Sequence, residues 1–309
     1  MLISLSQLLL KAENSARKIA QSSPETKEDI LSLNVSEAIL AGLSLIAIIA
    51  GIFYLLRKPS GQRIKLTDQR ENKISIFIAA GIFLLAFIIS GLTTTSLTEI
   101  FQPGKSSKSE KEEIMSFITL VTNIPSIILI LYASKALFKN GLAGLGFPKL
   151  SQYAKNILKG IYYFFAAYLP VLVALILTAM LLQLINHLSG TSYKMQVHDS
   201  IPAIKQMGSL GQLLFGIGIA FIVPIFEELV FRGIIQTSFR NYMSPILSIM
   251  LGSVFFAAMH ADITHFFALF VLSCFMGYSY EKTGKIIVPI TVHVCFNSTV
   301  LILNIAAVS

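Results

Sequence analysis

The residues that are scarce in this chain exclude several classes of protein. Charged residues make up 13% of its 309 residues, whereas soluble globular domains contain about 25%. The two cysteines, Cys274 and Cys295, both lie inside apolar stretches, so neither a disulfide framework nor a zinc knuckle is available. No glycine-rich nucleotide-binding motif and no basic-aromatic pattern occurs in the sequence. We therefore expect no nucleic-acid partner and no ordinary soluble domain.

Apolar runs fill most of the chain instead. Hydrophobic residues make up 54% of it, and the mean hydropathy is +0.73. A helix needs about 20 apolar residues to cross a bilayer, and the apolar runs lie at about 35–56, 74–94, 114–138, 160–184, 210–236, 245–260, 265–280 and 286–307. The sequence therefore predicts an all-α fold, a polytopic transmembrane helical bundle with about eight spanning helices that has the lipid bilayer as a partner.

The chain divides into three parts. Residues 1–34 form a polar N-terminal segment, and residues 35–204 contain membrane helices without a distinctive motif. In residues 205–309, each apolar run carries a polar residue that a plain spanning helix would avoid. We therefore expect the chemistry of the protein in this last part.

The net charge of +8 comes largely from short segments between the apolar runs. Lys and Arg gather in residues 57–73, in residues 135–159, at Arg240 and in residues 281–285. Basic loops are retained on the cytoplasmic side of a membrane. We therefore predict that these segments are cytoplasmic, that the first span has its N-terminus outside, and that the charge reflects topology.

A cluster of charged residues interrupts the apolar run at 210–236. Glu227, Glu228 and Arg232 all lie within it, and charge at membrane depth costs at least ~2.5 kcal/mol per group. Such a cluster is predicted to be a functional site. Arg232 follows Glu228 by four residues, which places the two side chains on one helix face. We expect Arg232 to neutralise Glu228 and leave Glu227 as the reactive carboxylate.

Polar residues in later runs are predicted to lie at similar depth. At ~1.5 Å per residue from the expected cytoplasmic helix ends, Glu228, His260, His293 and Asn297 lie roughly 11 to 22 Å deep. His293 and Asn297 are spaced i, i+4, so they present an imidazole and a carboxamide on one helix face. Phe256 and His260 have the same spacing, which puts an aromatic ring one turn below the second imidazole.

These side chains together suit the hydrolysis of an amide bond. A carboxylate and an imidazole can hold a water molecule and remove its proton as it attacks a carbonyl. A second imidazole and a carboxamide can stabilise the oxyanion; loss of one such donor costs ~3 kcal/mol in other enzymes. No serine or cysteine nucleophile is required.

Three motifs in this order resemble the CPBP (Abi) family of intramembrane proteases. They are EExxxR at Glu227–Arg232, FxxxH at Phe256–His260 and HxxxN at His293–Asn297. The segment Gly277–Gly284 and Pro289 also resemble bacterial members of the family. The resemblance covers about residues 205–300 and implies a location in a bacterial cell membrane.

The resemblance also implies roles for individual residues. It makes residues 205–309 a catalytic helical core in which Glu227 and His260 activate water and His293 and Asn297 stabilise the oxyanion. Glu228 and Arg232 support the site, as Phe256 is expected to do. The implied substrate is a peptide or membrane protein cut near the cytoplasmic face. The family includes the CAAX prenyl endopeptidase, although a prenylated CAAX substrate requires a host that prenylates proteins.

Zinc is the alternative to a metal-free mechanism. The family is often described as metalloproteases, and Glu227, His260 and His293 are the candidate ligands for Zn²⁺. The sequence has no HExxH motif, and these ligands would come from three helices. A water activated by a glutamate suits the same residues, so the metal-free mechanism is preferred here and zinc stays open.

Other interpretations of the same residues involve no catalysis. Taken singly, a glutamate near a helix end can form a salt bridge, and a buried histidine or asparagine can join helices. The alternative function is therefore a non-enzymatic membrane scaffold, or a bacteriocin-immunity or regulatory protein of the same family. A proton-coupled transporter would use membrane-embedded Glu and His as well, although here the charged residues cluster towards one side.

Overall fold

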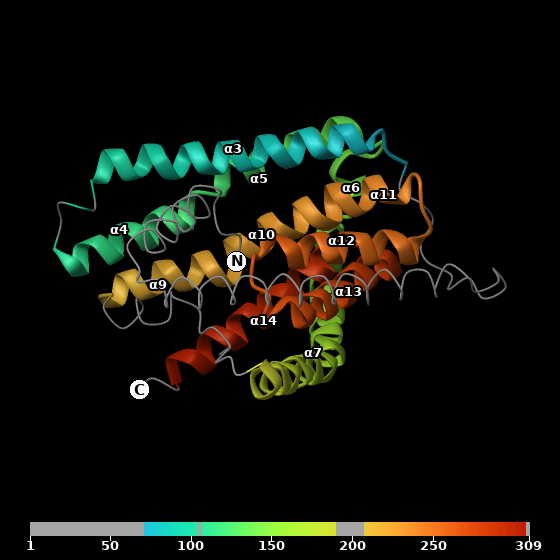
Figure 1. Cartoon of the computed structure of the whole chain (residues 1–309). Helices are drawn as coiled ribbons and strands as arrows, with labels where there is room; N and C mark the ends of the chain where they lie inside the picture. Colours follow the sequence, from blue (N-terminus) through green and yellow to red (C-terminus); the bar gives the residue numbers. More distant parts are fainter. Residues whose placement is uncertain (1–70, 103, 105–106, 190–206, 307–309) are drawn as a thin grey trace.

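The computed structural model describes residues 71–102, 104, 107–189 and 207–306, and this part of the chain is helical without any strand (Figure 1). The longer helices are α3 (Ile76–Phe101), α4 (Lys108–Val121), α5 (Ile124–Leu137), α7 (Tyr153–Ser189), α12 (Pro245–Met259), α13 (Phe266–Thr283) and α14 (Ile287–Ala306). Short helices lie at Gly141–Leu145 (α6) and Leu150–Gln152 (η2). The predicted polar segment 1–34 and the predicted span 35–56 lie outside the described residues.

Each apolar run predicted from residue 74 onward corresponds to a helix. Four helical stretches are long and apolar enough to cross a membrane: Ile76–Phe101, Glu110–Leu137, Gly141–Ser189 and Ser209–Arg240. Two shorter apolar helices follow at Pro245–Met259 and Ile287–Leu303. The second stretch is interrupted between α4 and α5, where Pro125 lies in the first turn of α5. The all-α membrane bundle is therefore confirmed.

Ser209–Arg240 is the central helix of the bundle. In its most apolar window 56% of the residues are buried, against 17% to 22% in the other three long stretches. It is a continuous series of α9 (Ser209–Ile217), η3 (Gly218–Ile222), α10 (Val223–Glu228), η4 (Leu229–Gln236) and α11 (Thr237–Arg240). Both η3 and η4 are π-helical, a wider turn that often occurs at functional sites.

Local chemistry accounts for part of this irregular winding. Pro224 has no backbone N–H to donate, so the turn that precedes it cannot complete the α-helical bonding pattern. At the end of η4, the Thr237 hydroxyl donates to the carbonyl of Arg232 at 2.9 Å. The π turns therefore lie on both sides of the two glutamates of α10.

Apolar side chains enclose the part of this helix that carries the two glutamates and Arg232. Phe226, Leu229, Phe231 and Ile234 are each at most 2% exposed and belong to one core with residues of α5, α6, α13 and α14. The outer helices differ, because large apolar side chains such as Phe77 are exposed, as lipid-facing residues are. The charged residues of the central helix therefore lie inside protein and are shielded from lipid.

Several loops join the helices at one end of the bundle, near α6 and α11 at the right of Figure 1. There the Tyr280 hydroxyl donates to the Leu145 carbonyl at 2.7 Å, and Lys139 pairs with Glu71. Gly146 has φ 107°, and a Cβ on it would lie 2.7 Å from the Gly284 carbonyl oxygen. Only glycine therefore allows α6 to end against the turn between α13 and α14. We call this the basic end, because the predicted cytoplasmic lysines lie in these loops.

Candidate active site

The two glutamates and the arginine of the central helix are fully enclosed. Glu227 and Glu228 are 0% exposed and Arg232 is 2% exposed. Arg232 Nη1 donates to Glu228 Oε1 at 2.8 Å, so the pair predicted from the four-residue spacing is present. A buried charge needs such a partner, because its desolvation is otherwise costly. The ion pair thus offsets the desolvation cost of one of the two buried carboxylates, that of Glu228.

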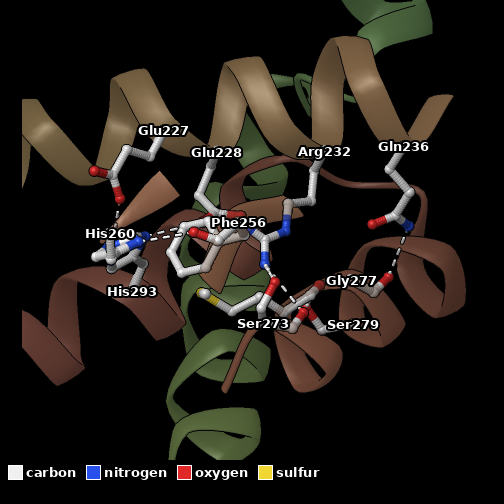
Figure 2. Close-up of polar contacts among 11 residues, drawn as sticks. Glu227, Glu228, Arg232, Gln236, Phe256, His260, Ser273, Gly277, Ser279 and His293 are labelled. Carbon is white, nitrogen blue, oxygen red and sulfur yellow. Dashed lines mark hydrogen bonds and ion pairs between the residues drawn. The ribbon is translucent and has the colours of Figure 1, made fainter. Parts of the chain in front are cut away.

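His293 of α14 lies between the two carboxylates (Figure 2). Its Nδ1 is 2.9 Å from Glu228 Oε1, and its Nε2 is 3.5 Å from Glu227 Oε2. Glu228 Oε1 already accepts from Arg232, so His293 Nδ1 is assigned as the donor to the same oxygen. Glu228 therefore orients the imidazole of His293 in addition to pairing with Arg232, which the sequence did not predict.

His260 is the C-cap residue that follows α12. Its Nδ1 lies 2.8 Å from the carbonyl oxygen of Phe256. A carbonyl can only accept, so Nδ1 carries the proton and, in the neutral imidazole, Nε2 keeps its lone pair. His260 lies within electrostatic reach of both Glu227 and His293. His260 Nε2 can therefore accept a hydrogen bond on the side that faces Glu227.

The helix that carries His260 is one residue shorter than the predicted run to residue 260. Ala261 has φ 50°, a left-handed conformation that stops the helix. Asp262 Oδ1 then accepts from the backbone N–H groups of Thr264 and His265 at 2.9 and 3.2 Å. This turn was not predicted from the sequence, although an aspartate just before an apolar run is a helix-start signal.

Phe256 lies at the centre of the group. Its ring centroid is 4.6 Å from that of His260 and 5.8 Å from that of His293. The Arg232 guanidinium carbon lies 4.9 Å from the same centroid, within the range of a cation–π contact. The predicted contact between Phe256 and His260 is confirmed, and the ring also separates the arginine from the two histidines (Figure 2).

Asn297 makes its hydrogen bond elsewhere. Its Nδ2 donates to the carbonyl of Ile219 in η3 at 2.9 Å, and it lies one turn beyond His293 on α14. A carboxamide NH₂ has two N–H groups, so this bond engages one of them. The structure therefore brings together six of the seven predicted residues, while Asn297 joins α14 to the central helix beside them.

Ser273 of α13 was not predicted and contacts Arg232. Arg232 Nη2 donates to the Ser273 hydroxyl oxygen at 2.8 Å and to its carbonyl oxygen at 3.0 Å. A serine in an apolar run carries no distinctive sequence signal by itself. In the described residues, no group of three or more His, Cys, Asp or Glu side chains is arranged to hold a metal ion. Both alternatives from the sequence, a metal-free site and a zinc site, therefore stay open.

Comparisons with known proteins found a matching family model and a similar protein. Residues 209–299, which contain all seven predicted site residues, match the family model described as Type II CAAX prenyl endopeptidase Rce1-like. A protein of Bacillus subtilis (strain 168) named "Putative membrane peptidase YdiL" is 29% identical over 89 residues, which are 29% of this chain and 36% of that protein. The match therefore spans about a third of that relative's length. No solved structure matches the chain. The chain is thus a multi-pass membrane protein, and its residues 209–299 resemble the CPBP family of proteases.

Proposed function

We propose that the protein is an endopeptidase that hydrolyses a peptide bond of a peptide or membrane protein near the cytoplasmic face of the membrane. The observation that carries the proposal is the position of Glu227, a fully buried carboxylate that faces His293 Nε2 and lies beside His260. A buried carboxylate between two imidazoles has no packing role that an apolar side chain would not fill better. It suits proton transfer.

Glu227 and His260 hold the attacking water in this proposal. His260 Nδ1 is engaged by the Phe256 carbonyl, so its Nε2 accepts a hydrogen bond from the water. Glu227 takes the water proton as the oxygen attacks the carbonyl carbon of the substrate. The carbon–oxygen bond forms, and the carbonyl oxygen becomes an oxyanion. The same proton then passes to the leaving nitrogen as the carbon–nitrogen bond breaks.

Charge balance supports His293 as the oxyanion donor. Glu227, Glu228 and Arg232 carry a net charge of −1 when both histidines are neutral, and an uncompensated buried charge is costly. One more proton on the group would remove that charge. His293 lies between both carboxylates, so an imidazolium there has partners on both sides. Its Nε2–H can turn from Glu227 to the oxyanion, and the second N–H of Asn297 supplies another donor.

The family match and the membrane setting support this substrate class. A peptide segment would enter from the basic end, where the predicted cytoplasmic loops lie. A prenylated CAAX protein is one substrate of this class, if the host prenylates proteins. No step of the proposed reaction involves a metal. Chelator treatment of the purified protein is therefore expected to leave cleavage unchanged, and loss of cleavage that zinc restores would instead assign Glu227, His260 and His293 as ligands.

The test is a comparison of membrane peptidomes from cells that carry wild-type protein, Glu227→Ala or His260→Ala. Both variants are expected to lower cleavage by at least about 100-fold while the protein still accumulates in the membrane. Glu99→Gln, at an exposed position of α3, is the matched control and should cleave normally. An unchanged peptidome and phenotype in Glu227→Ala would contradict the proposal and favour a scaffold, regulator or immunity protein.

A further inference from the structure

A line of hydrogen-bonded residues joins the central helix to α13, and of these residues only Arg232 enters the proposed mechanism. On the central helix they are Arg232, Gln236 and Arg240, and on α13 they are Ser273, Gly277 and Glu281. We call these six residues the polar seam. Within each helix they repeat every four residues, and each bonds a residue 41 positions away in the sequence. Figure 2 shows the first two pairs of the line, Arg232 with Ser273 and Gln236 with Gly277.

The hydrogen bonds of the polar seam fix the relative height of the two helices. Gln236 Nε2 donates to the Gly277 carbonyl at 3.1 Å and to Glu281 Oε1 at 3.0 Å. Arg240 Nε donates to Glu281 Oε2 at 3.1 Å. Both sets of residues advance together along the chain, so the helices run parallel. A shift of one helical turn would separate all three pairs and leave buried polar groups without partners, which is costly.

Close packing makes this register strict. Gln236 and Glu281 are 2% exposed and Ser273 is 1% exposed. A Cβ on Gly277 would lie 2.8 Å from Gln236 Oε1 and 3.2 Å from Ile249 Cγ2. Any larger residue at position 277 would push the helices apart. The glycine therefore permits the hydrogen bond from the Gln236 side-chain amide to its own carbonyl. The polar seam therefore holds α13 at one height against the central helix.

A continuous set of contacts leads from the polar seam to the candidate active site. Ser273 accepts twice from Arg232 Nη2, and Arg232 Nη1 donates to Glu228 Oε1. The same Oε1 lies 2.9 Å from His293 Nδ1. The position of the guanidinium therefore decides where Glu228 lies, and Glu228 in turn decides how the His293 ring is turned.

We propose that Ser273 is a positioning residue for the reaction, which holds Arg232 at the height where Glu228 orients His293. The inference rests on the proposed peptide hydrolysis, in which His293 stabilises the oxyanion. Ser273 touches no reacting atom. Its hydroxyl acts on turnover through Arg232, Glu228 and His293, and it has no part in binding the substrate.

Ser273→Ala and Ser279→Ala make a matched pair of variants. Both serines are on α13 and at most 1% exposed, but the Ser279 hydroxyl donates to the Met276 carbonyl of its own helix at 2.8 Å. Ser273→Ala is expected to lower kcat about tenfold, since a hydrogen bond to a charged group is lost, with KM changed less than about twofold. Ser273→Thr keeps the hydroxyl and should restore kcat. Ser279→Ala should have the kcat and KM of the wild type.

A second readout does not depend on activity. The ring nitrogens of His293 in ¹⁵N-histidine-labelled protein, assigned with His293→Gln, should give shifted NMR signals in Ser273→Ala and unchanged signals in Ser279→Ala. If Ser273→Ala does not fold, Ser273→Cys takes its place, because it keeps the volume with a weaker hydrogen-bonding group. Unchanged kcat and unchanged His293 signals in a folded variant would overturn the inference. A wild-type protein without proteolysis would instead overturn the proposed function, and the nitrogen signals would still decide the role of Ser273.

Discussion

The helices before residue 190 and those after residue 207 use buried polar groups in different ways. Between α3 and α5, Ser90 and Ser126 hydroxyls lie 2.9 Å apart, and the Ser126 hydroxyl donates to the Ala86 carbonyl at 2.7 Å. These are neutral groups that join two helices. In the C-terminal part the buried groups also include charged ones, such as Glu228 and Arg232. Small hydroxyls suffice for packing in a membrane, whereas charges indicate a site.

The largest expected effect on stability comes from removing one member of the buried ion pair. Arg232→Ala leaves Glu228 charged and enclosed, which is expected to destabilise the protein by ~3–5 kcal/mol. Thermal unfolding in detergent measures the change. The double variant Arg232→Met with Glu228→Leu removes both charges and should recover much of the loss while it abolishes turnover. Equal destabilisation by the single and double variants would mean that the charges themselves are not the reason.

A smaller effect is expected at the turn after His260. Burial alone would raise the pKa of Asp262, but hydrogen bonds from His265 and Thr264 outweigh it and hold that pKa below its ordinary value. The folded-state pKa is therefore the lower one, so the stabilisation is present above the pKa of an unfolded aspartate, about 4, and is lost as pH falls through the folded-state pKa. Asp262→Ala should cost about 1 kcal/mol at neutral pH. Unfolding midpoints measured from neutral to acidic pH should show this difference shrinking at acidic pH; a constant difference would contradict it.

The smallest expected effect is in the N-terminal helices. Ser126→Ala removes hydroxyl contacts to Ser90 and to the Ala86 carbonyl, and such bonds between membrane helices contribute about 0.6 kcal/mol on average. Unfolding of this variant should therefore differ little from wild type, and cleavage should be unchanged. A loss as large as that of Arg232→Ala would remove the distinction between the two parts of the molecule.

Contacts within one helix were predictable from spacing, and contacts between helices were less so. The i, i+4 rule predicted the pairs Glu228 with Arg232 and Phe256 with His260, because neither depends on how helices pack. Overlapping depths indicated that His293 would come near the glutamates, but depth does not say which carboxylate its Nδ1 reaches. The bond of Asn297 to Ile219 depends on the π turn of η3, for which no spacing rule exists. Ser273 and Gln236 were missed because uncharged residues at membrane depth are common in helix contacts.

The left-handed conformation of Ala261 affects both the thermal stability of the protein and its turnover. A residue with a Cβ in this conformation is strained by about 1–2 kcal/mol, and glycine is not. Ala261→Gly would therefore relieve strain, yet it would also loosen the backbone directly after His260, whose ring depends on the last turn of α12. Ala261 thus lowers the stability of the folded protein slightly, and it also keeps the His260 imidazole directed at Glu227. Selection for heat resistance alone would act against it, and selection for turnover would retain it.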